Sequence, residues 1–267
     1  MEQPRSVLAL LTDFGTRDSY VGVMKGVILG IAPGVALVDL THEIPPQNVR
    51  AAAYNLLVSY RYFPAGTVFC CVVDPGVGSQ RRAVAVRAGA YTFVCPDNGL
   101  LTAVLNETPA AHAVSLENPE YHLPHVSATF HGRDIFAPVA AHLARGVPLE
   151  ALGPELDPGH LVRLDWPRPR PTADGGWEAV VVYADHFGNL VTNLPGHLLA
   201  PPADAWRVDV GPLTISGVRR TFADVEVGEP VAYVGSSGFL ELAVRQGNAR
   251  RQWNVGPGLM VRLRRAG

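Results

Sequence analysis

Two aspartates follow short apolar runs and stand in loops that contain glycine. Asp13 lies in the segment TDFG, where a carboxylate at a strand end can accept hydrogen bonds from ribose hydroxyls, bind a metal or cap a helix. Asp74 lies in VDPGVGSQRR, in which two glycines let the backbone approach a ligand and Arg81 can pair with the aspartate. On these residues alone, a helix cap explains Asp13 equally well. A tight turn with a surface ion pair is the simpler explanation of the second segment.

A third cluster, TFHGRD, contains His131 just before a predicted helix and Asp134 at the start of that helix. Histidine is the most frequent acid–base residue because its pKa lies near neutrality. A capping role explains Asp134, whereas a histidine beside a glycine has no comparable structural explanation. We therefore regard His131 as a candidate catalytic residue.

Two further clusters lie in the second half of the chain. In DHFGN, an aromatic ring and an amide could bind a flat heterocycle, and in SSGF with the following GNA, small polar residues could bind a carboxylate or a purine edge. Polar hairpin loops and ordinary turns explain both clusters as well. The candidate ligand-binding residues here are Asp185, Phe187, Asn189, Ser236, Ser237, Glu241, Asn248 and Ala249.

Alternating strand and helix patterns must position the first three clusters. Strands are predicted at Val7–Leu11, Ala36–Leu40, Thr67–Val73, Ala83–Ala88 and Tyr91–Cys95, and helices at Tyr20–Ile31, Asn48–Ser59, Asn98–Asn106 and Asp134–Ala144. This alternation predicts an α/β sandwich. The loops at Asp13, at Asp74 and at residues 96–99 each leave a strand end, where functional groups gather.

A proline-rich stretch near residues 152–175 marks a change in composition. It predicts an N-terminal domain over residues 1–165, a linker over 166–174 and a C-terminal domain over 175–267. The last domain shows short strands and no long helix, which favours a small antiparallel β-barrel or sandwich. Its strands are predicted at Trp177–Tyr183, Trp206–Val210, Leu213–Ile215, Val231–Val234, Phe239–Val244 and Leu259–Leu263.

The overall composition excludes several classes of protein. With 48% hydrophobic residues, 17% charged residues and a formal charge of −2, the 267-residue chain is globular and has no basic stripe for nucleic acid. Three cysteines, two of them adjacent in an apolar run, argue against disulfides, and no zinc-ligand spacing occurs. Neither a signal peptide nor a membrane span is evident. We expect a cytoplasmic protein with no metal site.

Several motifs in one order resemble a known family over the whole chain. They are LTDFGTRDSYVGVMKG, DLTHEIPPQNVRAAAYNL, VVDPGVGSQRR, PDNGLLT, TFHGRDIFAP, YADHFGNLVTN and SSGFLELAVRQGNA. Together they are similar to the S-adenosyl-L-methionine (SAM) hydroxide adenosyltransferases, which are relatives of fluorinating and chlorinating enzymes that act on the same sulfonium.

The resemblance implies an α/β/α sandwich with a central, mostly parallel sheet, followed by a small antiparallel β-barrel. It also implies a homotrimer with active sites between the N-domain of one subunit and the C-domain of the next. By this resemblance, the nucleophilic water is surrounded by Asp74, Arg81 and His131, and the ribose hydroxyls bind to Asp13. The resemblance also places the binding of the methionine part at Asp185, Ser236 and Ser237. It places the binding of the adenine at Phe187, Asn189, Asn248 and Ala249.

The implied reaction is hydrolysis of SAM to adenosine and L-methionine by in-line attack of water on C5′. The sulfur bonded to C5′ carries a positive charge, so methionine departs as a neutral molecule when the C5′–S bond breaks. Neither an acid nor a metal nor a cofactor is therefore needed. The demand falls on the nucleophile, because orientation of a weak nucleophile such as water can contribute up to ~7–11 kcal/mol. Either Asp74 or His131 could accept the proton, since arginine stays protonated.

Three alternatives compete with hydrolysis. Halogenation at C5′ is disfavoured because Asp74 replaces an uncharged residue and Gly132 replaces the serine of the fluorinating enzyme. A carboxylate repels a halide by about 4 kcal/mol at 4 Å for an effective dielectric constant of 20. A non-catalytic SAM- or adenosine-binding protein would not need the Asp74, Arg81 and His131 set. A metal-dependent phosphohydrolase that uses Asp13, Asp74 and His131 would lose its activity with EDTA.

Overall fold

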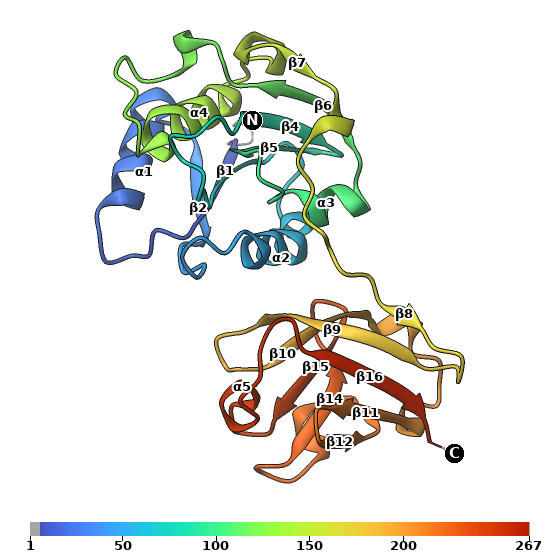
Figure 1. The fold of residues 1–267 in the computed structure, drawn as a ribbon. Helices are drawn as coiled ribbons and strands as arrows, with labels where there is room; N and C mark the ends of the chain where they lie inside the picture. The colour runs from blue at the N-terminus through green and yellow to red at the C-terminus, as the bar shows by residue number, and fades with distance from the viewer. Residues whose placement is uncertain (1–5, 267) are drawn as a thin grey trace, which may run out of the picture. The chain divides into compact units, whose positions relative to one another are not determined.

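The computed structural model describes residues 6–266, which form two compact units that meet in sequence between Trp166 and Pro167 (Figure 1). Each unit has its own hydrophobic core. Part of the segment expected as a linker, Arg170–Pro171, forms strand β8 and pairs with β9 of the second unit. Within residues 6–266, no helix has the length and apolar character needed to cross a bilayer.

The first unit is built on a seven-stranded mixed sheet with the order β2-β1-β3-β5-β4-β6-β7. The parallel strands β2, β1, β3 and β5 form one half of the sheet, and antiparallel pairs add β4, β6 and β7. Their bounds are β1 Val7–Thr12, β2 Ala36–Thr41, β3 Val68–Val72, β4 Ala83–Ala88, β5 Tyr91–Pro96, β6 Ala110–Ser115 and β7 Glu155–Leu156.

Helices cover both faces of this sheet, which explains why β1 and β3 are almost continuously apolar. One face carries α1 (Tyr20–Ile31) and α4 (Ala137–Ala144), and the other carries α2 (Val49–Ser59) and α3 (Thr102–Glu107) (Figure 1). The predicted α/β/α sandwich is therefore confirmed.

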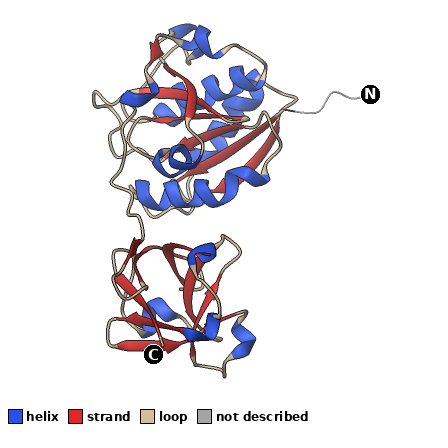
Figure 2. Cartoon of the chain, turned by 90° about the vertical axis from the view of Figure 1, so that its right-hand side faces the viewer, coloured by secondary structure: helices blue, strands red, loops and turns tan. Residues whose placement is uncertain are grey.

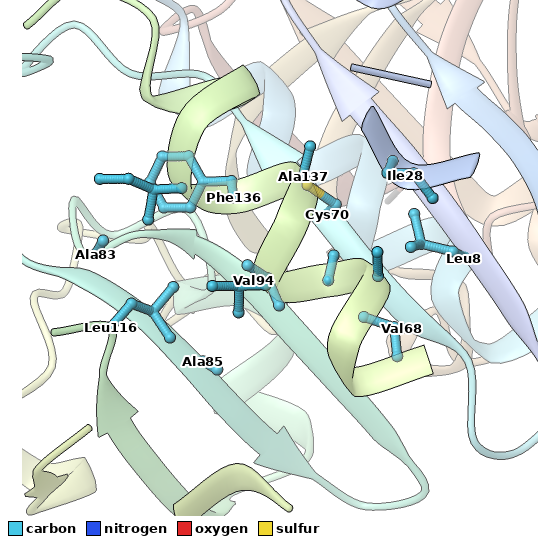
Figure 3. Close-up of a cluster of buried hydrophobic side chains, with 14 of the residues drawn as sticks. Leu8, Ile28, Val68, Cys70, Ala83, Ala85, Val94, Leu116, Phe136 and Ala137 are labelled. Carbon is cyan, nitrogen blue, oxygen red and sulfur yellow. The ribbon is translucent and has the colours of Figure 1, made fainter. Parts of the chain in front are cut away.

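The core between α1, α4 and the sheet supports the strand ends that carry the polar loops. Leu8 and Cys70 from the sheet pack there with Ile28 and Phe136 from the helical layer (Figure 3). Phe136 is fully buried, and the guanidinium of Arg81 lies 5.3 Å from the centre of its ring. The same core that holds the sandwich together therefore also contacts a predicted site residue.

Several local expectations for the first unit need revision. The helix expected from Asn98 begins only at Thr102, and the two-residue strand β7 was not predicted. Strand β6 was not predicted, because its sequence AAHAVS has neither strand periodicity nor β-branched enrichment; antiparallel pairing with β4 stabilises it. The helix expected from Asp134 begins earlier, as a π-helical turn over Gly132–Phe136 that continues into α4. Such turns often mark functional sites.

The second unit is a nine-stranded, strongly curved sheet (Figure 2) with the order β12-β11-β16-β9-β10-β15-β14-β13, and β8 pairs with β9. Its end strands β12 and β13 are separated by only Gly217, so the two edges of the sheet must come together, as in a nearly closed barrel. The remaining bounds are β9 Trp177–Ala184, β10 Leu190–Pro195, β11 Trp206–Val210, β12 Leu213–Ser216, β13 Val218–Arg219, β14 Pro230–Val234, β15 Phe239–Val244 and β16 Met260–Arg265.

The predicted barrel is confirmed, with differences in detail, among them the unpredicted two-residue strand β13. The pair β13–β14 is parallel rather than antiparallel. Strand β10 was not predicted, because Thr192 and Asn193 interrupt its apolar pattern. Both residues are buried and hydrogen-bonded: Thr192 Oγ1 donates to the Leu240 carbonyl, and Asn193 Oδ1 accepts from the Val180 amide. Their polar groups are therefore satisfied inside the sheet.

Candidate active site

Asp74 and Arg81 form a nearly buried ion pair in the loop that follows β3. Arg81 Nε lies 3.0 and 2.9 Å from the two carboxylate oxygens, and Nη2 lies 2.5 Å from Oδ2. Only 5% of the Asp74 side chain and 11% of the Arg81 side chain are exposed. The loop therefore folds back so that the two residues pair, but the pair is not the surface ion pair of the simpler explanation. Charge-assisted bonds of this kind fix geometry strongly.

His131 joins this pair through the same arginine nitrogen. Arg81 Nη2 lies 2.7 Å from His131 Nδ1. Because a guanidinium can only donate hydrogen bonds, Nδ1 must be the acceptor, and a neutral imidazole then carries its proton on Nε2. The pKa of His131 is lowered, chiefly by burial and then by the charge of Arg81, against smaller opposing effects of Asp74, Asp134 and the Ser127 backbone. His131 is therefore a neutral acceptor toward Arg81 at neutral pH.

This protonation state predicts the acid side of the pH profile. Neutral His131 can accept from Arg81, whereas the imidazolium cannot, and the lowered pKa keeps the neutral form present below the usual value of 6.5. We expect kcat to stay flat across neutral pH and to fall only as the pH drops through this lowered pKa. Steady-state rates between about pH 5 and 8 test this. An acid limb centred at or above 6.5, or the same limb in His131→Gln, would contradict the assignment.

The loop from Asp74 to Arg81 also touches the segment before His131. Gly78 adopts φ +77°, and a Cβ placed on it would lie 2.8 Å from the Ala128 carbonyl oxygen. From the third strand-end loop, Asn98 Nδ2 donates to the Val73 carbonyl at 2.8 Å, directly before Asp74. Asn98 was not predicted as a site residue, although its loop was. These contacts fix the backbone on both sides of Asp74.

The Gly78 contact predicts a loss of activity on a very small substitution. In Gly78→Ala, the methyl group must displace the Ala128 backbone, and the left-handed conformation adds about 1–2 kcal/mol of strain. We expect Gly78→Ala to lower both kcat and the unfolding temperature. Gly66→Ala is the matched control, because Gly66 has φ +85° but nothing within 4 Å of its Cβ position. Equal kcat in the two variants would show that the contact does not position the site.

Asp13 and Asp74 lie at the same edge of the sheet. Their loops follow β1 and β3, which are parallel neighbours with Thr12 opposite Val72. Asp13 Oδ2 accepts the Gln47 amide at 2.7 Å, and Gln47 adopts φ +65°. Helix α1 has Ser19 at its N-cap, so Asp13 does not cap that helix. The capping alternative is therefore wrong for α1, and the strained backbone at Gln47 presents its N–H to this carboxylate instead.

In the second unit, the β9–β10 hairpin loop is ordered by Asp185. Its two carboxylate oxygens accept from the backbone and side-chain nitrogens of Asn189, each at 2.8 Å. Phe187 is 70% exposed at the tip, so its ring is free to stack on a ligand. The loop lies against Asn248, since a Cβ on Gly188 would meet that side chain.

Asn248 and Ala249 begin the short helix α5 (Ala249–Gln252). Asn248 Oδ1 accepts from the Arg251 amide as the N-cap, and Ala249 is fully buried. The predicted residues of the two loops are therefore neighbours, but the capping oxygen of Asn248 is already engaged within the chain.

Glu241 organises the turn that contains the two candidate serines. It accepts from the Tyr233 hydroxyl at 2.6 Å and from Ser237 Oγ at 3.2 Å. A Cβ on Gly235 would overlap the same carboxylate. Glu241 is 9% exposed, so its contacts are mainly with this turn, which also carries Ser236. Across residues 6–266, no three His, Cys, Asp or Glu side chains are grouped as a metal site.

Comparisons with known proteins were made for the whole chain. The family model of the SAM hydroxide adenosyltransferase N-terminal domain matches residues 8–153, and that of the C-terminal domain matches residues 179–262. The chain is 47% identical to an (R)-S-adenosyl-L-methionine hydrolase of Thermus thermophilus, over 95% of this chain and 97% of the relative. A fluorinase of Actinopolyspora mzabensis is 32% identical, over 98% of both chains.

A solved structure of an uncharacterized conserved protein from Thermotoga maritima superposes with a TM-score of 0.91 at 40% identity. The match covers 97% of this chain and all of that one. Both units are therefore matched by a single experimental structure.

Proposed function

Because the chain belongs to the SAM hydroxide adenosyltransferase family, we propose that it hydrolyses S-adenosyl-L-methionine to adenosine and L-methionine. The observation that carries this conclusion is the buried arrangement of Asp74, Arg81 and His131. A protein that only bound SAM would gain little from burying this ion pair, since desolvation costs several kcal/mol per ion.

The geometry favours Asp74 as the group that accepts the proton of water. The Nδ1 lone pair of His131 is already engaged by Arg81, and its Nε2 carries a hydrogen, so the imidazole has no free acceptor. The carboxylate keeps unused lone pairs beyond its bonds to Arg81. As water oxygen bonds to C5′, the C5′–S electrons move to sulfur, methionine leaves as a neutral thioether, and Asp74 receives the proton. In-line orientation by the fixed set supplies the main rate enhancement.

The same geometry disfavours a halide nucleophile, for a reason that differs from simple charge repulsion. Arg81 largely neutralises Asp74, so repulsion alone is weaker than for an isolated carboxylate. However, Arg81 Nε and Nη2 donate to Asp74 and His131, so these N–H groups are not available to replace the hydration of a halide. The Asp74 carboxylate can accept a hydrogen bond from water, whereas a halide has no hydrogen to give it.

Product analysis tests the proposal. Purified protein incubated with SAM should release adenosine and methionine in equal amounts, both with EDTA and with added chloride or fluoride. The absence of adenosine at every enzyme concentration would overturn it. A 5′-halogenated nucleoside would identify the halogenating alternative, and loss of activity with EDTA the metal-dependent one.

Finer features belong to the proposal as well. We expect the R epimer at sulfur to be hydrolysed, because a relative bears that name, and assays of both epimers test this. Ligand-binding roles for Asp13 and for the residues named in the second unit rest on the resemblance, as does the homotrimer, which light scattering tests. The proposed reaction uses no cofactor. A cytoplasmic location accords with three free buried cysteines.

A further inference from the structure

His42 is a buried histidine directly after β2 that the proposed reaction does not use. Its side chain is 3% exposed, and its Nδ1 lies 2.8 Å from Thr12 Oγ1. On the other side of the ring, Nε2 lies 3.1 Å from Asp39 Oδ1, as a close contact rather than a well-directed hydrogen bond. Because a carboxylate repels a bare lone pair, this contact favours the tautomer with its hydrogen on Nε2. Thr12 then donates to Nδ1.

An irregularity in β2 brings the ring of His42 and the carboxylate of Asp39 together. The two residues are three apart, so they would face opposite sides of a regular strand. Pairing with β1 skips Leu40, which lies between Asp39 and Thr41, as in a β-bulge. Bulges often re-aim side chains beside functional sites. Asp39 is also held in place by Lys25, whose Nζ donates to its Oδ2 at 2.6 Å.

His42 is bonded to the chain on both sides of Asp13. The residue before Asp13 is Thr12, whose Oγ1 contacts the His42 ring and accepts from the Phe14 amide at 3.2 Å. After Asp13, the Gly15 amide donates to the His42 carbonyl at 2.8 Å. Thr12 is fully buried, so its hydroxyl group has no solvent to bond with in place of the histidine. The position of the Asp13 backbone therefore depends on His42.

The Asp13 carboxylate uses one oxygen for the chain and leaves the other for a ligand. Its Oδ2 accepts from the Gln47 amide, whereas no group within residues 6–266 donates to Oδ1. Gln47 belongs to the loop that begins at His42, so the same loop fixes the backbone of Asp13 and the direction of its carboxylate. An oxygen with unused lone pairs can accept from a hydroxyl group of a ligand.

We propose that His42 is a positioning residue for Asp13: its ring holds Thr12 and its carbonyl holds Gly15, so that the Asp13 carboxylate faces the ribose hydroxyls of the ligand. This inference rests on the proposed function for the identity of the ligand. It predicts a loss of affinity that depends on the ribose hydroxyls. A merely structural role predicts an equal loss for nucleosides with and without them.

Thr192 provides a matched control for Thr12. It is also fully buried, its Oγ1 donates to the Leu240 carbonyl at 2.8 Å, and the same oxygen accepts from the Leu194 amide at 3.2 Å. Thr12→Val and Thr192→Val therefore remove hydroxyl groups with the same burial and similar hydrogen bonds. Only the first substitution breaks the contact with His42.

The test measures the dissociation constants of adenosine and 2′,3′-dideoxyadenosine by calorimetry, and their ratio is the diol preference. We expect the wild type to bind adenosine at least about tenfold more tightly, as for hydrogen bonds to a charged group. Thr12→Val should remove most of this preference, as should His42→Gln, whose amide can reach Asp39 but not Thr12. Thr12→Ser and Thr192→Val should keep it. With SAM, Thr12→Val and His42→Gln should raise KM more than they lower kcat.

A double variant shows whether His42 acts through Asp13. In the Asp13→Ala background, His42→Gln should not change the diol preference further, because both substitutions act on the same contact. A further loss in that background would overturn the inference. So would a wild type without the preference, a preference retained in both His42→Gln and Thr12→Val, or an equal weakening of both nucleosides in these variants.

Two other outcomes are distinguishable. If His42→Gln does not fold, the comparison of Thr12→Val with Thr12→Ser decides, and an equal preference in these two variants overturns the inference. If the wild type shows the diol preference and the variants respond as expected, but no adenosine is released from SAM, the proposed function fails while the positioning role stands.

Discussion

Asp74→Asn is expected to lower kcat for SAM hydrolysis by about two to three orders of magnitude while KM changes little. Asparagine has nearly the same shape, so the substrate pocket is preserved. Its neutral amide cannot accept the proton of water, and it provides one acceptor oxygen where Arg81 now uses two. The effect therefore falls on the transition state rather than on binding.

The measurement is a steady-state kcat and KM for wild type and variant, with the unfolding temperature of each. Asp97→Asn is the control, since it also removes a buried carboxylate that pairs with an arginine. A variant with raised KM and unchanged kcat would mean that Asp74 contributes to binding only. In that event the water-activating role would be wrong.

Arg81→Lys is the second large effect that we expect, because it keeps the charge but loses the planar fork. Arg81 Nη2 contacts both Asp74 and His131, while Nε spans the carboxylate. An ammonium is a point charge and cannot reproduce this geometry. Loss of one or two charge-assisted hydrogen bonds, each about 1.5–3 kcal/mol, predicts a fall in kcat of at least about tenfold and up to about 10⁴-fold.

Arg82→Lys is the matched control at the neighbouring position. Arg82 makes a similar fork with Asp97 and also donates to the His160 carbonyl, so its replacement should lower stability and leave kcat near the wild-type value. If Arg82→Lys and Arg81→Lys lose the same activity, the Arg81 fork has no special role. The double variant Asp74→Asn with Arg81→Lys should lose little more than the worse single variant, because the residues act as a unit.

Much of the fold was predictable because its central elements carry strong local signals. The buried strands around Leu8 and Cys70 are continuous apolar runs, and the loops at Asp13 and Asp74 follow them directly. Strands β6 and β10 were missed because tertiary pairing and satisfied polar groups, rather than local pattern, stabilise them. Such information lies in contacts between segments that are distant in sequence.

The residues of the candidate site were predictable, but the contacts between them were not. The residue types and the resemblance brought Asp74, Arg81 and His131 together, but they left the proton acceptor open between Asp74 and His131. The contact between Arg81 Nη2 and His131 Nδ1 supports the proposal that Asp74 is the acceptor. Asp134 looked like a helix cap, because nothing in its local sequence reveals the Ser127 amide as its partner. Asn98 likewise gave only a loop signal.

The most direct test of the central claim is the origin of the oxygen in the product. Enzyme and SAM are incubated in ¹⁸O-labelled water, and the nucleoside and amino-acid products are analysed by mass spectrometry. Attack of an activated water on C5′ predicts one ¹⁸O atom in the 5′-hydroxyl of adenosine and none in methionine. Adenosine without the label, or label in any product that still carries sulfur on C5′, would contradict the account.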